Sequence, residues 1–119
     1  MAKSKVALIR TKPETVMDDI ARAYELGGAK QALQAGATTI LKDNISWHFP
    51  MPSSNTTPWG LEGSVLGLRG MGFEDLVVVE NRTVVTQTEK GDRLCRFRPV
   101  IEKYRLPLKF NFKPADMTW

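Results

Sequence analysis

The run from Thr38 to Thr83 constrains the fold more than any other part of the chain. It reads as a β-branched strand, a long polar loop, a helix that Thr57 and Pro58 open, and a Val-rich strand. In a parallel sheet the carboxyl ends of the strands share one edge, and α/β proteins hold ligands there. The sequence therefore predicts that two polar clusters meet at one edge of a sheet.

The flanking segments continue this alternation of strand and helix. The apolar run Lys5–Arg10 is typical of a strand buried on both faces. Thr11 and Glu14 have the spacing of a capping box, which predicts a helix from there to Gly27. Further strands are predicted at Thr38–Leu41, Leu76–Val79 and Leu108–Phe112, and a short helix at Pro99–Tyr104, whereas Thr83–Gly91 reads as either strand or loop.

Three glycines fall on one side of the helix that follows Thr57, namely Gly60, Gly63 and Gly67. Glycine costs roughly 1 kcal/mol per residue in helix propensity, so a compensating contact is expected. Close approach of this helix to the sheet or to a ligand would supply that contact.

These elements predict a three-layer α/β fold with a mostly parallel sheet of about four strands and flanking helices. No helix follows the last predicted strand, although such a sheet needs cover on both faces. We therefore interpret residues 1–119 as a single α/β domain that is incomplete and forms the N-terminal part of a longer domain.

Composition narrows the class of protein. No apolar run approaches the roughly 18 residues of a membrane span, and the start lacks the features of a signal peptide, so a cytoplasmic protein without membrane contact is expected. Cys95 is the single cysteine and His48 the single histidine, which excludes an internal disulfide, a thiolate zinc site, an iron–sulfur cluster and a multi-histidine metal site within this chain. No metal and no cofactor are predicted for it.

The net charge of +4 comes from 17 basic and 13 acidic residues, and basic side chains crowd the last third of the chain. Two interpretations are open: a solvated or chain-covered surface, or a patch that binds an acidic partner or nucleic acid. The first is favoured, because the interleaved aromatic residues fit a helix and a strand turned toward a core. The sequence does not indicate an oligomeric state.

Three blocks carry a family resemblance: residues 39–44 (TILKDN), 55–59 (NTTPW) and 72–81 (GFEDLVVVEN). In this order they resemble the domain of unknown function 362 family, from about Val6 to the C-terminus. Asp43 stands where that family usually has proline. The resemblance implies the N-terminal portion of a longer protein, with ferredoxin-like cysteine motifs, and hence an iron–sulfur cluster, in the missing C-terminal part.

The predicted edge gathers donors for a small anion, because the helix opened by Thr57 points its first turn there beside the Lys42 ammonium. An alternative assigns structural roles: Thr57 caps, Lys42 pairs with Glu80, and the asparagines shape turns. The predicted ligand-binding residues are Lys42, Asn44, Thr56, Thr57, Glu80, Asn81 and Thr83.

Two further side chains have possible chemistry. His48 lies between Trp47 and Phe49 in the long loop and is the candidate general acid or base, with a packed loop residue as the alternative. Cys95 lies among arginines that would lower its pKa, although an inert thiol is the favoured interpretation.

No common nucleotide-binding motif is present. The sequence thus predicts binding of phosphate or carboxylate as part of an enzyme site, and leaves open an interaction module or a fragment without independent activity.

Overall fold

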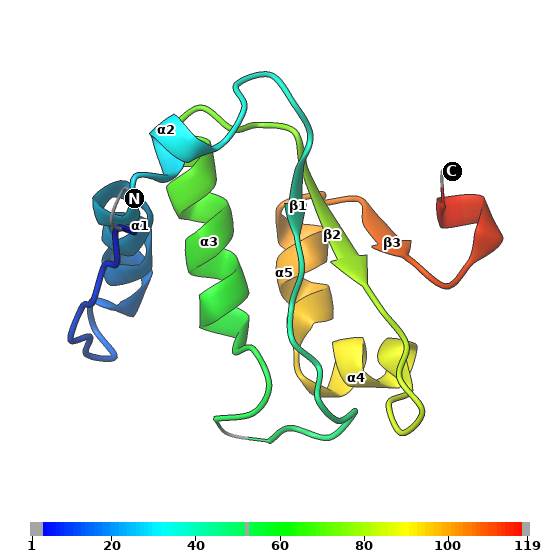
Figure 1. Cartoon of the computed structure of the whole chain (residues 1–119). Helices are drawn as coiled ribbons and strands as arrows, with labels where there is room; N and C mark the ends of the chain where they lie inside the picture. The colour runs from blue at the N-terminus through cyan, green and yellow to red at the C-terminus, as the bar shows by residue number, and fades with distance from the viewer. Residues whose placement is uncertain (1–3, 52, 118–119) are drawn as a thin grey trace.

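The computed structural model describes residues 4–51 and 53–117 and has an α/β architecture with a small open parallel sheet (Figure 1). The sheet order is β1-β2-β3, and both pairs of neighbouring strands are parallel. The elements follow in the order α1 (Val16–Gly27), α2 (Ala29–Ala32), β1 (Thr39–Leu41), α3 (Pro58–Gly70), β2 (Leu76–Glu80), α4 (Thr88–Leu94), α5 (Phe97–Lys103), β3 (Leu108–Phe110) and the 3-10 helix η1 (Pro114–Asp116).

The core lies between the sheet and the helices α3 and α5, which Figure 1 shows side by side. Leu41 aligns with Val78 and Val78 with Leu108, so one row of apolar side chains crosses the sheet. Alternate residues of a strand share a face, and this row is therefore on the helix-covered face. The helices contribute Leu61, Val65, Leu68, Phe97, Val100 and Ile101 to the same cluster.

The opposite face of the sheet carries little cover. Ile40 is 63% exposed, and a hollow of about 400 Å³ is lined by Ile40, Val79 and Lys109 together with Asp116 and Met117 near η1. Within the described residues the predicted third layer is not seen, and the sheet has three strands rather than about four.

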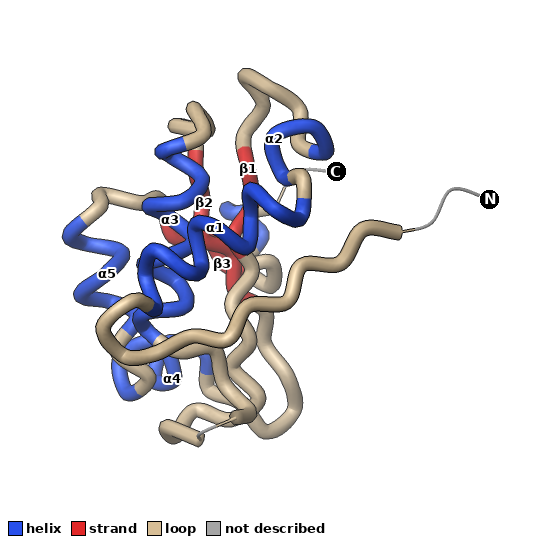
Figure 2. The backbone as a smooth tube through the Cα atoms, turned by 90° about the vertical axis from the view of Figure 1, so that its left-hand side faces the viewer, coloured by secondary structure: helices blue, strands red, loops and turns tan. Residues whose placement is uncertain are grey.

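The predicted strand at Lys5–Arg10 is the missing fourth one. These residues form neither strand nor helix, and Figure 2 shows the segment passing α1 and leading away from the sheet. Val6 is 86% exposed and Leu8 is 94% exposed. The apolar side chains that predicted a buried strand are therefore not buried in the described structure. A strand depends on a partner far along the chain, which local composition does not specify.

The glycines of α3 permit close packing against α1. A Cβ atom on Gly67 would lie 2.9 Å from the Cα atom of Ala21, and one on Gly63 would lie 2.8 Å from the Cδ1 atom of Ile20. The close approach expected from the sequence therefore occurs, but the partner is a helix, not the sheet or a ligand. Gly60 instead lies beside Thr56 and Thr57.

Helix boundaries differ from the sequence prediction at two places. The first helix starts at Val16 with Thr15 as N-cap, four residues after Thr11, because the residue before Pro13 is disfavoured in helical conformation. The ambiguous segment Thr83–Gly91 ends inside α4. In the part of the chain that is described, none of the helices has both the length and the apolar character needed to cross a bilayer.

Candidate functional site

The carboxyl ends of β1 and β2 lie at one edge of the sheet, together with the amino end of α3 (Figure 1). Thr39 pairs with Leu76 and Leu41 with Val78, both in parallel, so the polar residues that follow each strand start at the same level. The predicted convergence of two polar clusters at this edge is confirmed for Lys42 and Glu80.

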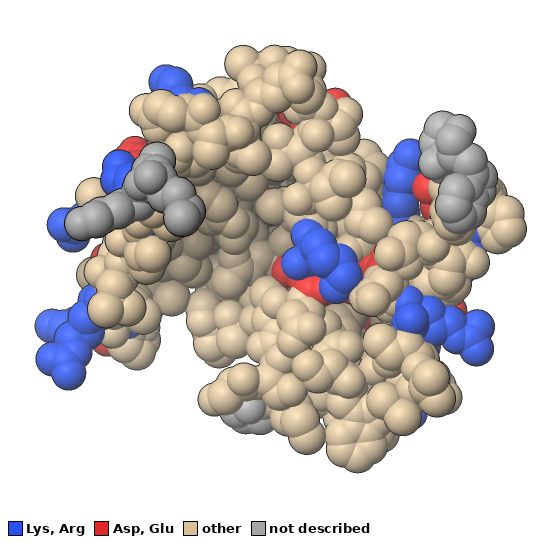
Figure 3. All heavy atoms as spheres, viewed as in Figure 1, with Lys and Arg blue, Asp and Glu red and all other residues tan. Residues whose placement is uncertain are grey.

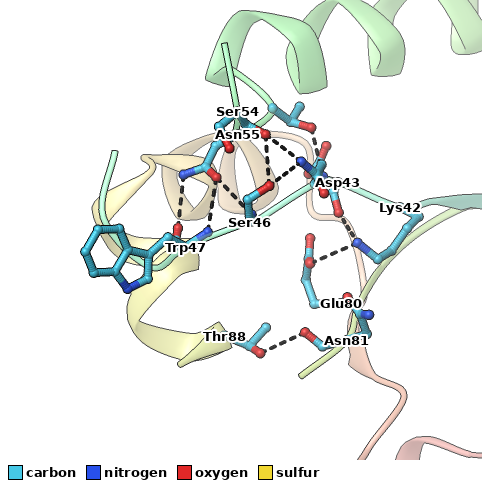
Figure 4. A network of polar contacts seen from close by, with 11 residues as sticks. Lys42, Asp43, Ser46, Trp47, Ser54, Asn55, Glu80, Asn81 and Thr88 are labelled. Atoms are coloured by element: carbon cyan, nitrogen blue, oxygen red, sulfur yellow. Dashed lines mark hydrogen bonds and ion pairs between the residues drawn. The ribbon is translucent and has the colours of Figure 1, made fainter. Parts of the chain in front are cut away.

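Lys42 and Glu80 form an ion pair at this edge (Figure 4). The Lys42 Nζ atom lies 3.7 Å from Glu80 Oε2 and also donates a hydrogen bond to the carbonyl oxygen of Asp43. At 3.7 Å the pair is electrostatic rather than hydrogen-bonded. Glu80 is 2% exposed, and neither of its carboxylate oxygens accepts a hydrogen bond from a described residue.

Burial dominates the acid–base behaviour of this edge. Burial raises the pKa of Glu80 to about 8, although the Lys42 ammonium acts in the opposite direction. Burial likewise raises the pKa of Asp43 to about 6. A buried carboxyl without hydrogen-bond donors is better accommodated when protonated, so burial favours the neutral form of Glu80 while the nearby Lys42 ammonium favours the ionised form, and burial is the larger effect.

Asp92 is a third buried carboxyl near this edge, with 1% of its surface exposed and its pKa raised by burial. The guanidinium group of Arg98 forms an ion pair with it. In Figure 3, which has the same view as Figure 1, Lys or Arg side chains lie directly in front of Asp or Glu side chains at the centre of the molecule. Among the described residues, no three His, Cys, Asp or Glu side chains are placed to hold a metal ion.

The long loop after β1 is held by its own polar side chains (Figure 4). The Asn55 amide donates to the carbonyl oxygens of Trp47 and Phe49 and accepts from the Ser46 amide at 2.9 Å. The Asn44 amide N–H donates to Thr56 Oγ1 at 2.8 Å. Asn44 therefore shapes the loop, which agrees with the structural alternative for this residue.

Asn81 and Thr83 do not join the cluster of Lys42 and Glu80. The carbonyl oxygen of Asn81 accepts a hydrogen bond from the Thr88 hydroxyl at 2.9 Å, which fixes the start of α4 (Figure 4). Thr83 is exposed and contributes no side-chain hydrogen bond in the described structure. Thr88, the first residue of α4, makes this hydrogen bond, a role that the sequence did not predict.

His48 and Cys95 are held by packing. The His48 ring centroid lies 4.5 Å from that of Phe49, and its Nδ1 atom accepts a long hydrogen bond from the Gln87 amide at 3.5 Å. Cys95 is buried, its Sγ atom lies 3.3 Å from the Asn55 Nδ2 atom, and burial raises the pKa of its thiol. A thiol with a raised pKa is a poor nucleophile at neutral pH, which supports the inert interpretation.

A cavity of about 450 Å³ opens at the amino end of α3, and we call it the Arg96 cavity. Thr56 and Thr57 line it on one side, and Arg96 and Cys95 come from the turn between α4 and α5. The rest of its wall is largely apolar and includes Met51, Trp59 and Leu94. Lys42, Glu80 and Asn81 do not line it, so the predicted site residues divide into two places.

Arg96 is the cavity residue that sequence reasoning missed. It has φ +64° and ψ +28°, in the left-handed region, and serves as the N-cap position of α5. This conformation costs a non-glycine residue roughly 1–2 kcal/mol, and such residues are concentrated at functional sites. Nothing in the local sequence marks arginine for a left-handed position.

The first turn of α3 borders the Arg96 cavity and has one amide without an acceptor among the described residues. Thr57 caps the helix, since its Oγ1 atom accepts from the Gly60 amide at 3.1 Å, and its carbonyl accepts from Leu61. Pro58 has no amide hydrogen. The Trp59 amide is then the first-turn donor for which no acceptor is found among the described residues.

The basic residues of the last third are partly neutralised by ion pairs. Lys103 Nζ lies 2.6 Å from Glu62 Oε1, and Lys113 Nζ lies 2.5 Å from Glu89 Oε1. Of the interleaved aromatic residues, Phe97 is 1% exposed and Phe110 is 9% exposed, whereas Tyr104 and Phe112 are half-buried. The stripe of exposed aromatic and basic side chains that nucleic-acid binding would need is interrupted.

Comparisons of the chain with protein-family models, with curated proteins and with solved structures returned no match.

Proposed function

We propose that the protein binds a small anion, a phosphate or carboxylate group, in the Arg96 cavity, which serves as the binding part of an enzyme site. The observation that carries the proposal is that Thr56, Thr57 and Arg96 line one cavity at the amino end of α3. The cavity volume lies in the range of small-molecule sites, roughly 300–1,000 Å³.

The donors in the cavity complement an oxyanion. The helix dipole and the unbonded Trp59 amide favour negative charge at the start of α3. The hydroxyls of Thr56 and Thr57 already accept hydrogen bonds, so each retains its proton for donation to a ligand. Arg96 supplies a guanidinium group, which binds carboxylate and phosphate through two parallel hydrogen bonds.

The electrostatic surroundings of the cavity support the same ligand class. No Asp or Glu is among the described residues that line it. The buried carboxyls Asp43 and Glu80 belong instead to the strand edge, where Lys42 offsets them. This edge of the sheet thus has two parts: the buried carboxyls Asp43 and Glu80 beside Lys42, and the Arg96 cavity, which is open to a ligand.

A glycine substitution at Arg96 provides a sharp test. Arg96→Gly removes the guanidinium group and also relieves the left-handed backbone, so loss of binding could not be attributed to unfolding. Arg105→Gly is the matched control, because Arg105 has φ +52° and does not line the Arg96 cavity. Isothermal titration with inorganic phosphate and with acetate measures the affinity of each protein.

We expect the wild type and Arg105→Gly to bind with equal affinity. Arg96→Gly should bind at least about tenfold more weakly, because a charge-assisted hydrogen bond contributes about 1.5–3 kcal/mol. Equal affinity of Arg96→Gly and the wild type, or no heat of binding with either anion, would refute the proposal.

We also propose that Lys5–Arg10 adds the fourth strand, parallel to β1. On the side away from β2, the described structure gives β1 no pairing partner, and Val6 and Leu8 remain exposed. The helix α1 would then connect two parallel strands, and Thr11 would stay at the rim where α1 begins. Protection of the amides of Val6 and Leu8 against hydrogen exchange is expected, and complete lack of protection would contradict it.

The resemblance to the domain of unknown function 362 family remains a prediction, as does the iron–sulfur cluster that it implies for a longer protein.

A further inference from the structure

A second cavity adjoins the first and points to the class of ligand. This space of about 550 Å³, which we call the Lys12 cavity, lies between the segment ahead of α1 and the start of α3. Trp59 lines both cavities and is their shared wall. The residues around the Lys12 cavity are Thr11, Lys12, Pro13, Val16, Met17 and Trp59.

The wall that α1 gives to the Lys12 cavity is apolar and incompletely covered. No residue of α1 is fully buried, and Val16 and Met17 are only half-buried although they belong to its apolar side. Trp59 is 52% exposed on the opposite wall. An indole ring and two aliphatic side chains that face a common space are suited to an apolar group of a ligand.

Charge restricts what this apolar group is attached to. Lys12 lies at one cavity and Arg96 at the other, and in the part of the chain that is described neither cavity is lined by Asp or Glu. A neutral apolar ligand would make no contact that uses the charge of the exposed Arg96 guanidinium group or the Trp59 amide. An amphipathic anion matches both the basic donors and the apolar walls.

We propose that the two cavities form one elongated site for an amphipathic anion, an alkyl or aryl phosphate or carboxylate. Its acidic group binds at Arg96, Thr56 and Thr57, and its apolar body crosses Trp59 to lie against Val16 and Met17. This inference rests on the proposed function of the Arg96 cavity and adds the chemical nature of the remainder of the ligand.

The test uses inorganic, methyl, butyl and octyl phosphate as probes, titrated into the full chain below their micelle concentrations. Each methylene that leaves water contributes about 0.8 kcal/mol, which corresponds to about fourfold in affinity. We therefore expect the dissociation constant to fall by up to about fourfold for each added methylene until the Lys12 cavity is filled.

A polar substitution in the wall of the Lys12 cavity distinguishes the contributions of the two cavities to binding. Met17→Gln keeps the size of the side chain and should weaken octyl phosphate by about tenfold while leaving inorganic phosphate unchanged. Leu26→Gln is the matched control on the same helix, since Leu26 is 44% exposed and lies outside both cavities. It should alter neither affinity.

The outcomes distinguish the two proposals. Equal affinity for inorganic and octyl phosphate, or equal effects of the two glutamine variants, would overturn the elongated site and leave the anion site intact. Absence of binding to every probe would overturn both. Stronger binding to vesicles that contain phosphatidic acid than to octyl phosphate, with no competition between them, would assign the apolar surface to a membrane and overturn the ligand inference.

Discussion

The buried carboxyl of Glu80 makes stability depend on pH in a defined direction. Its pKa is raised from 4.5 to about 8 in the folded protein, so the folded state retains a proton that the unfolded state has already released. The unfolded state binds fewer protons between these values, and the free energy of unfolding therefore falls as pH rises through this window. Once the pH is about one unit above this folded pKa, the contribution is fully lost and the free energy of unfolding no longer changes through Glu80.

The size of the effect follows from the shift. A displacement of about 3.5 pKa units corresponds to about 5 kcal/mol over the whole window, as an upper bound, because the pair reaches solvent through Lys42, which is 42% exposed. Between about pH 6.5 and 8.5 the linkage relation gives a loss of about 2 kcal/mol from Glu80 alone. Asp43, with its pKa raised to about 6, contributes mainly below this interval.

Urea unfolding of the wild type and of Glu80→Gln at both pH values measures this loss. Glutamine mimics the protonated carboxyl, so the variant should show little change in stability, whereas the urea midpoint of the wild type should fall by about 1 M. Glu74→Gln is the control, because it makes the same substitution at a side chain that is 76% exposed. An equal pH dependence in the wild type and Glu80→Gln, or a wild-type stability that rises with pH, would show that Glu80 is not protonated in the folded state.

Two further pairs of substitutions test the packing and the start of α3. Gly67→Ala should destabilise the protein by about 1–2 kcal/mol, because the new methyl group meets the backbone of Ala21, whereas Gly70→Ala, with no atom within 4 Å, should stabilise it by up to about 1 kcal/mol in the same urea assay. Equal effects of both would contradict the close helix contact. Thr57→Ala should cost about 1 kcal/mol through loss of the cap and Thr57→Ser should cost little; a neutral alanine variant would argue against the cap.

The parts of the fold that sequence predicts well are those set by local rules. Thr57 and Pro58 mark the start of α3 because one side chain caps and the other fits the first helical position. The Val-rich run after Asp75 forms β2, the central strand of the sheet. Its side chains are largely buried, as a continuous apolar run predicts. The parallel direction of β1 and β2 then follows from the intervening helix, and it brings Lys42 to Glu80.

The parts that sequence did not predict depend on distant contacts. Lys5–Arg10 has the composition of a strand but is not paired in the described structure, since strand formation requires a partner that the segment itself does not specify, and its pairing with β1 is a proposal. The glycines of α3 correctly predicted a close neighbour, but the expected neighbour was the sheet or a ligand, and the structure places α1 there. Thr83 follows β2 as predicted but is separated from the site, because the chain turns away at Asn81 to begin α4.

The predicted site residues divide between the Lys42–Glu80 contact and the Arg96 cavity. The polar residues that follow the strands therefore did not identify the whole of the proposed site. Lys42 is a predicted anion donor, yet its ammonium group lies against the Glu80 carboxyl and donates a hydrogen bond to the Asp43 carbonyl oxygen. The positive charge that remains for a ligand comes from Arg96, which reaches the amino end of α3 through a left-handed turn between two helices. Under the proposed function, the cavity beside α3 selects the ligand, while the buried carboxyls at the strand ends make the stability of the supporting sheet depend on pH.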